Sequence, residues 1–291
     1  MGRKHLWGEK NPKKTPLLVF NRSEQRAKDL QERLPSGSVR IADSIQDAVA
    51  QADIVFTCLS DDDAVKTVFD VVLASEPAGK LFVECSTIYP SETKALSEQI
   101  FQAGARFVAC PVFGAPDQAN LGQLVCAPAG EPSDVQKVLP YCENVMGRAV
   151  IDLSGKPPES ATTLKVIGNS LIFNMVEAVA EGHVLAEKSG LGVTQLHKYL
   201  SLFFPGVYTN YSTRMITGDY WDREEPLFHA YLARKDANHA MRLAKAVDTR
   251  LPALEVANEH FEMVEKLKGN KGDYVGLYGV LRLEAGMAYE N

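Results

Sequence analysis

The sequence predicts an α/β domain with a doubly wound parallel sheet, followed by an all-α domain. Short apolar strands alternate with amphipathic helices up to about residue 152, a pattern typical of parallel βαβ units. Beyond Lys156-Pro157-Pro158 only helical periodicity continues to the C-terminus. The chain has 291 residues, 45% of them hydrophobic, which is enough to bury two cores. We therefore predict domains at residues 1–156 and 157–291.

The predicted elements follow the apolar runs in chain order. Strands are predicted at residues 17–20, 39–42, 54–59, 81–85, 106–110, 123–127 and 149–152. Helices are predicted at residues 24–33, 45–50, 64–73, 90–103 and 132–144. A long helix at about residues 161–189 is expected to join the two domains, and Gly190 and Gly192 are expected to end it. Ligands of such sheets bind at the carboxyl ends of the strands.

Composition narrows the class of protein. A net charge of −6 and a pI near 5.6 argue against a nucleic-acid surface, which needs basic residues to neutralise phosphates. No apolar run is long enough to span a membrane, and residues 1–15 are too polar for a signal peptide. The five cysteines are an odd number without CxxC spacing. We expect reduced core thiols in a cytoplasmic protein that binds a small molecule.

Lys165 and Asn169 are the strongest candidates for catalysis. They stand four residues apart in the run ATTLKVIGNSL, so on a helix they project from one face and can reach one small molecule. Apolar neighbours on several sides would strip water from the lysine, lower its pKa and suit it to proton transfer. A snorkelling lysine at a helix edge is the competing interpretation, and the lysine taken alone favours it.

The ends of the predicted strands carry the candidate ligand contacts. Asn21, Arg22 and Ser23 follow the first strand, where an arginine favours the 2′-phosphate of NADP over the free hydroxyl of NAD. Small or hydroxyl-bearing residues follow three later strands. These residues are Leu59 with Ser60, Ser86 with Thr87, and Gly114 after Phe113. Each pair alone is common in turns, but the repetition of such pairs at successive strand ends indicates a ligand site.

Several motifs in the same order resemble the β-hydroxyacid dehydrogenase family, which includes hydroxyisobutyrate dehydrogenases and 6-phosphogluconate dehydrogenase-like proteins. The matching segments are NRS at 21–23, LSDDDAV at 59–65, ECSTIYPSET at 84–93, CPVFGAP at 110–116, KVIGN at 165–169, PLFHAYLARKD at 226–236 and GNKGDYVGL at 269–277. The resemblance covers most of the chain. It implies a Rossmann domain, a long interdomain helix, an all-α domain and homodimers or homotetramers.

The resemblance also implies roles for single residues. Lys165 looks like the catalytic lysine of the family, and Asn169 resembles the asparagine that positions the substrate. Thr87 and Gly114 would lie near the substrate carboxylate. Lys235 resembles the lysine beside the cofactor, with Asp236 as its structural companion, and Phe228 resembles an aromatic wall of the substrate site.

Two departures from the family pattern stand out. Family members open with a strand and a GxGxMG turn, whereas this chain begins Met1-Gly2-Arg3, as if inside that turn, so its sheet is expected to lack the first strand. Residues 3–14, in the place of the first helix, contain Gly8 and Pro12 and are expected to form a poor helix. Phe113 stands where the family normally has a serine, which indicates a larger or more apolar substrate.

Two hypotheses follow. The first is an NADP-dependent oxidoreductase that moves a hydride between nicotinamide and a small carbonyl or hydroxyacid-like substrate, with Lys165 as proton donor. Imine reduction is a variant of it, but retention of the lysine favours carbonyl chemistry. The second is a non-catalytic relative that acts only as a dimeric scaffold and binds cofactor weakly or not at all, because Gly2 alone cannot replace the glycine-rich turn that binds the pyrophosphate. Loss of a central strand would also expose the edges of its neighbours, which is an aggregation hazard.

Overall fold

The computed structural model describes residues 15–143 and 145–291. The chain forms two compact units, Met1–Lys165 and Val166–Asn291. The expectations for the opening turn at Gly2 and for a helix at residues 3–14 lie outside the described residues. The domain boundary expected between residues 156 and 157 stays a prediction.

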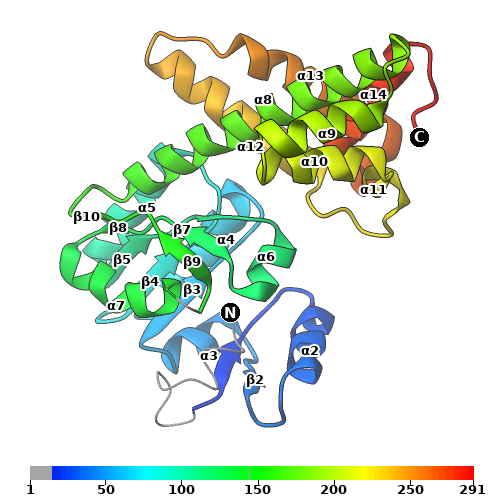
Figure 1. The fold of residues 1–291 in the computed structure, drawn as a ribbon. Helices are drawn as coiled ribbons and strands as arrows, with labels where there is room; N and C mark the ends of the chain where they lie inside the picture. Colours follow the sequence, from blue (N-terminus) through cyan, green and yellow to red (C-terminus); the bar gives the residue numbers. More distant parts are fainter. Residues whose placement is uncertain (1–14, 144) are drawn as a thin grey trace. The chain divides into compact units, whose positions relative to one another are not determined.

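The first unit contains the strands, and its central sheet has five of them in the order β10-β8-β5-β4-β3 (Figure 1). The neighbours pair in parallel except for β5 and β8, which are antiparallel. A second sheet has the order β6-β7-β9. The bounds are β3 Ile54–Thr57, β4 Leu81–Glu84, β5 Arg106–Ala109, β6 Val112–Phe113, β7 Leu124–Cys126, β8 Ala129–Gly130, β9 Gly147–Val150 and β10 Leu153–Ser154.

Helices cover both faces of the central sheet, as the doubly wound pattern predicts. Because side chains alternate along a strand, Phe82 and Phe107 pack on one face with the helices α4 and α5, whereas Val83 and Val108 pack on the other with α7. All four side chains are fully buried. The helices of this unit are α2 Glu24–Arg33, α3 Ile45–Ala50, α4 Asp62–Leu73, α5 Pro90–Gln102, α6 Pro116–Leu121 and α7 Pro132–Cys142.

The sheet is interrupted where the sequence predicts a missing strand. The strands β1 (Leu17–Val19) and β2 (Val39–Ile41) form a separate parallel pair. In the described part of the chain β3 is therefore an edge strand, and its residues are half-buried whereas those of β4 are fully covered. The described residues thus contain the split expected between β1 and β3. The short elements β6, α6, β8 and β10 are not predicted from the sequence.

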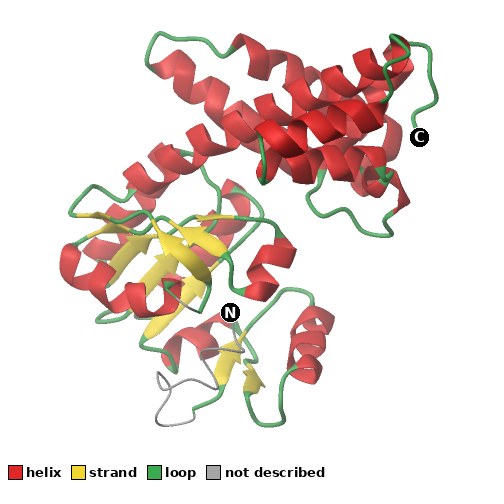
Figure 2. Ribbon diagram, viewed as in Figure 1, coloured by secondary structure: helices red, strands yellow, loops and turns green. Residues whose placement is uncertain are grey.

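The second unit is built from helices (Figure 2). The long helix α8 (Glu159–Lys188) begins in the first unit and ends before Gly190, whose φ of 79° stops it as predicted. In the hydrophobic core of the second unit, the ring of Phe173 lies in edge-to-face contact with the rings of Phe261 and Tyr274. The further helices are α9 Val193–Phe203, α10 Val207–Ile216, α11 Asp219–Asp222, α12 Ala230–Ala246, α13 Pro252–Lys268, η1 Gly269–Lys271, η2 Tyr274–Gly276 and α14 Leu277–Glu284.

Among the described residues, none of the helices combines the length and apolar character needed to cross a membrane.

Candidate functional site

The loops that follow β3 and β4 are tied together by hydrogen bonds. The Leu59 amide donates to Ser86 Oγ at 2.7 Å. Glu84, the last residue of β4, accepts from the Ser86 amide and from the Thr57 hydroxyl. These bonds hold the two strand ends at fixed positions, with Ser86 buried and Thr87 half-buried beside it. Ser86 therefore organises the loop backbone, which is a structural role in addition to the ligand contact predicted for it.

Glu84 is a positioning residue that the sequence analysis did not single out. Its carboxyl is 1% exposed, and this burial raises its pKa while hydrogen bonds from Ser86 and Thr57 oppose the rise. A carboxyl that accepts from both neighbouring strand ends fixes the loop that carries Thr87. The motif ECST could have pointed to Glu84, because an acidic residue at the end of a buried strand requires hydrogen-bond donors nearby.

The loop after β5 brings Phe113 to Lys165. Phe113 ends β6, and the Lys165 Nζ atom lies 4.7 Å from the centre of its ring. A cation at this distance over an aromatic face is attracted by the ring quadrupole, by about 0.5–1 kcal/mol where water has access. Both side chains are half-buried. The structure thus places the lysine amine beside the loop at the carboxyl edge of the sheet.

Gly114 has a backbone conformation that side chains resist. Its φ is 134°, and a Cβ atom there would lie 2.7 Å from Leu124 Cδ2 and 3.3 Å from Gln118 Cβ. Gln118 in turn accepts a hydrogen bond from the Ala115 amide at 2.5 Å. Glycine is therefore required for the turn that follows Phe113.

Asn21, Arg22 and Ser23 are exposed at the end of β1. The Asn21 Oδ1 atom accepts from the Ser23 amide at 2.9 Å, which forms a tight turn before α2. Ser60 is likewise exposed and donates to Asp61 at 2.7 Å, while Asp61 caps α4. These side chains are accessible to a ligand at the strand ends.

In the second unit, Asp236 joins two of the predicted residues. Asn169 Nδ2 donates to Asp236 Oδ2 at 2.7 Å, and Lys235 Nζ lies 3.1 Å from Asp236 Oδ1. Asp236 is 2% exposed, so this carboxylate is stabilised by the two partners and fixes their orientation. The companion role that the resemblance implies for Asp236 extends to Asn169, which sequence reasoning did not foresee.

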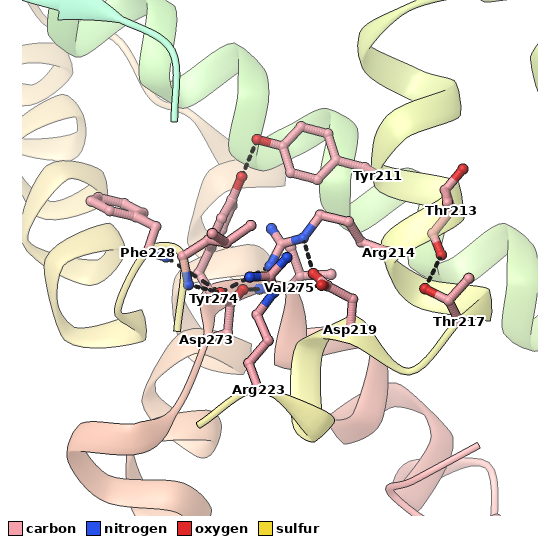
Figure 3. Close-up of polar contacts among 11 residues, drawn as sticks. Tyr211, Thr213, Arg214, Thr217, Asp219, Arg223, Phe228, Asp273, Tyr274 and Val275 are labelled. Atoms are coloured by element: carbon pink, nitrogen blue, oxygen red, sulfur yellow. Dashed lines mark hydrogen bonds and ion pairs between the residues drawn. The ribbon is translucent and has the colours of Figure 1, made fainter. Parts of the chain in front are cut away.

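Phe228 is held by Asp273, which also lies outside the predicted set (Figure 3). Asp273 accepts from the Phe228 amide at 3.3 Å and pairs with Arg214 at 2.9 Å. Although burial opposes its charge, Arg214 has a raised pKa because Asp273 and Asp219 lie beside it. The Phe228 ring packs edge-to-face on Tyr274, 5.5 Å away, and Tyr274 donates a hydrogen bond to Tyr211.

Other aromatic and apolar residues of this region belong to the core. The sequence leaves open whether Tyr208, Tyr211, Met215, Tyr220 and Trp221 line a pocket, with core packing favoured. Met215 and Tyr220 are fully or almost fully buried in the hydrophobic core of the second unit, which confirms the core interpretation for these two.

The predicted residues thus fall into local groups. In the first unit the structure joins Leu59 to Ser86 and Lys165 to Phe113, and in the second it joins Asn169 to Lys235 through Asp236. The positioning residues Glu84 and Asp273 both lie inside the motifs that carry the resemblance.

Comparisons with known proteins cover nearly the whole chain. Residues 1–155 match the model described as the NAD binding domain of 6-phosphogluconate dehydrogenase. Residues 160–281 match the model described as NAD-binding of NADP-dependent 3-hydroxyisobutyrate dehydrogenase. The NADH-dependent oxidoreductase ucdB of Aspergillus ustus is 34% identical over 275 residues, which are 94% of this chain and 92% of that protein.

Two further similarities are informative. The cytokine-like nuclear factor N-PAC of Danio rerio is 26% identical over 275 residues, 90% of this chain and 56% of that protein. The solved 3-hydroxyisobutyrate dehydrogenase of Mycobacterium tuberculosis, with L-serine, superposes with a TM-score of 0.76 at 22% identity. The match covers 90% of this chain and 89% of that one, and at this identity it shows a shared fold.

Gly114→Ala is expected to lower the free energy of unfolding by about 2–3 kcal/mol, because it adds a steric clash to an unfavourable φ. Gly37→Ala is the matched control: its φ is also positive, at 79°, but nothing lies within 4 Å of the added Cβ, so about 1 kcal/mol is expected. Urea unfolding followed by circular dichroism measures both. Equal losses would show that the contacts with Leu124 and Gln118 do not restrict this position.

Proposed function

Because the chain belongs to the β-hydroxyacid dehydrogenase family of NAD(P)-dependent oxidoreductases, we propose that it transfers a hydride between nicotinamide and a small carbonyl or hydroxyacid-like substrate. The observation that carries this proposal is the position of Lys165. Its amine lies beside Phe113, the last residue of β6, which the chain reaches directly after the carboxyl end of β5. Ligands of such sheets bind at the carboxyl ends of the strands.

Lys165 is the proposed proton donor. In the direction of reduction the carbonyl carbon receives a hydride, and its oxygen receives a proton from the Lys165 ammonium to give the alcohol. The bound nicotinamide cofactor supplies the hydride. In the opposite direction the neutral amine of Lys165 accepts the hydroxyl proton. Contact with the Phe113 ring restricts where the amine can lie.

Other residues are proposed to orient the substrate. Asn169 stands one helical turn beyond Lys165 on α8 and is fixed by Asp236. Thr87 and the Gly114 backbone are proposed to hold the acid end of the substrate. Phe228 is proposed as an aromatic contact. Phe113 replaces a hydroxyl with a ring, which supports a substrate that is larger or more apolar than a short hydroxyacid.

The proposed cofactor is NADP in preference to NAD. Support comes from Arg22 and Ser23, whose exposed side chains follow β1, where a guanidinium can bind a 2′-phosphate in two hydrogen bonds. Leu59, Ser60, Ser86 and Lys235 complete the proposed contacts. The Aspergillus ustus relative is named NADH-dependent, so the proposal for this chain rests on its own residues Arg22 and Ser23 and not on the family.

A second candidate function is a scaffold that binds cofactor weakly and does not catalyse. The split between β1 and β3 favours it, because β3 is an edge strand in the described residues. One relative, N-PAC, carries the name of a nuclear factor and not of an oxidoreductase. NADPH binding separates the two functions: energy transfer from tryptophan to bound NADPH supports the enzyme, and no binding at millimolar NADPH supports the scaffold.

Lys165→Met is expected to reduce turnover by on the order of 10³-fold, because the proton step loses its donor. The affinity for NADPH should change little, since binding uses other groups. NADPH oxidation is followed with a panel of small aldehydes and keto acids. Lys156→Met, which removes an exposed lysine of the same unit, is the control and should keep full activity. An active Lys165→Met enzyme would refute the assigned role.

Arg22→Ala is expected to weaken NADPH binding about tenfold, a change of about 1.4 kcal/mol, and to leave NADH binding unchanged. Arg26→Ala removes another exposed arginine, on α2, and should affect neither cofactor. Titration calorimetry with both cofactors measures the ratio. Equal losses of affinity for NADH and NADPH would show that Arg22 does not bind the 2′-phosphate.

We also propose a homodimer. Four exposed aromatic side chains form a continuous cluster on α9, on α10 and at the residue that ends α9. Tyr199 stacks on Phe203 at 4.9 Å and also contacts Phe204, which lies beside Tyr208 at 5.1 Å. Leu202, on α9, is 66% exposed. An exposed apolar surface of this kind is typical of a subunit interface.

Leu202→Glu combined with Phe203→Asp is expected to convert the dimer to a monomer, because it places two charges in the proposed interface. Sedimentation velocity measures the mass. Leu267→Glu, at an exposed leucine of α13, is the control and should remain dimeric. A monomeric wild-type chain would contradict the proposed dimer and leave the catalytic proposal intact.

A cytoplasmic location is proposed as well. Its support is that none of the five cysteines, all of which lie in the described residues, forms a disulfide, as suits a reducing compartment. Secretion of the protein from its own cells would contradict it.

A further inference from the structure

Three cysteines from distant parts of the chain meet in the core of the first unit. Cys110 follows β5, Cys126 ends β7 and Cys142 ends α7. Their sulfur atoms all lie within 4.8 Å of one another, and those of Cys110 and Cys142 are 3.7 Å apart. All three side chains are fully buried. The sequence analysis expected reduced core thiols, but it had no signal that three of them converge, since their spacing matches no metal-binding motif.

The spacing of the sulfur atoms fits one metal ion. Ions such as zinc bind thiolate sulfur at about 2.3 Å, so three sulfurs in a plane around one ion are about 4 Å apart. The observed separations between sulfur atoms, 3.7 Å for one pair and at most 4.8 Å for the others, are close to this value. Small side-chain rotations would bring all three sulfur atoms to the distance that one ion requires. Soft thiolate ligands select Cu(I), zinc and iron–sulfur clusters. Structural zinc sites almost always have four ligands, which makes a three-sulfur group better suited to Cu(I).

The apolar wall around the sulfurs is well packed. Val108, Val135, Val138 and Met146 belong to the same buried core as the three cysteines. Such a wall excludes water and oxidants, which favours Cu(I) over Cu(II). Cys85 is close by and hydrogen-bonds to Cys110. The Cys85 sulfur is nevertheless not one of the three that all lie within 4.8 Å of one another, so Cys85 is outside the triangle.

We propose that Cys110, Cys126 and Cys142 form a buried three-sulfur site for a single Cu(I) ion, separate from the proposed oxidoreductase site. No redox step is involved, because the ion is bound as Cu(I) and the thiols stay reduced.

The test is anaerobic titration of the whole protein with Cu(I) against a chelator that binds Cu(I) strongly, with the ion supplied to the folded protein and during refolding from urea. One ion per chain is expected, with a thiolate-to-copper charge-transfer band in the ultraviolet. Loss of one ligand, in Cys126→Ala or Cys142→Ala, should weaken the affinity on the order of 100-fold or more, since even indirect partners of a metal contribute 10–100-fold.

Two control variants sharpen the result. Cys58→Ala removes an exposed cysteine and should bind copper as the wild type does. Cys85→Ala should change the affinity only a few-fold. Binding that persists in Cys126→Ala, that disappears in Cys58→Ala or Cys85→Ala, or that is absent from the wild type would overturn the proposal.

X-ray absorption of the copper-loaded wild type tests the same site without a substitution, in case an alanine variant fails to fold. A first shell of three sulfur atoms is expected. A shell that contains nitrogen or oxygen, or only two or as many as four sulfurs, would refute the assignment. None of these readouts depends on the proposed oxidoreductase activity.

Discussion

The parallel pairing of β3, β4 and β5 is the constraint on which the first unit depends. The register places Thr57 opposite Glu84 and Glu84 opposite Ala109, so the three chains leave the sheet side by side at one edge. Leu59 and Ser86 are joined by a hydrogen bond at this edge, and the loop that leads to Phe113 and its contact with Lys165 starts from the same edge. The same register sets Cys110 beside Cys85, so the sulfur cluster and the proposed ligand site are two results of one pairing.

Buried carboxylates set the positions of the proposed site residues in both units. Glu84 joins two strand ends, Asp236 orients Asn169 and Lys235, and Asp273 anchors Phe228 through its amide. A buried acid is unfavourable unless its oxygens are satisfied, so each of them requires a fixed set of donors around it. Preorganisation of this kind holds the proposed residues in place before a ligand binds.

The sequence predicts most of the fold because its signals are local. The alternation of strands and helices, the long helix that ends before Gly190, and the helix bounds at residues 24–33 and 45–50 all follow from periodicity and caps. The strand β6 was missed because its two residues carry no period, and the helix α6 was missed because none of its residues is buried, so it has no apolar face. The contacts Asn169 with Asp236 and Cys110 with Cys142 join residues 67 and 32 positions apart, a separation at which a sequence pattern has no information.

The interruption of the sheet between β1 and β3 affects cofactor binding more than it affects proton transfer by Lys165. Lys165, Phe113 and Gly114 depend on β5, β6 and α8, which lie away from the split, and the five-stranded sheet beneath them is fully paired from β3 to β10. Arg22 and Ser23 depend on β1, whose only described partner is β2. A weak connection between β1 and β3 would therefore lower affinity for the adenosine end of the cofactor and leave the proton step unchanged. Weak cofactor binding together with normal turnover at saturation is the kinetic signature that this arrangement implies.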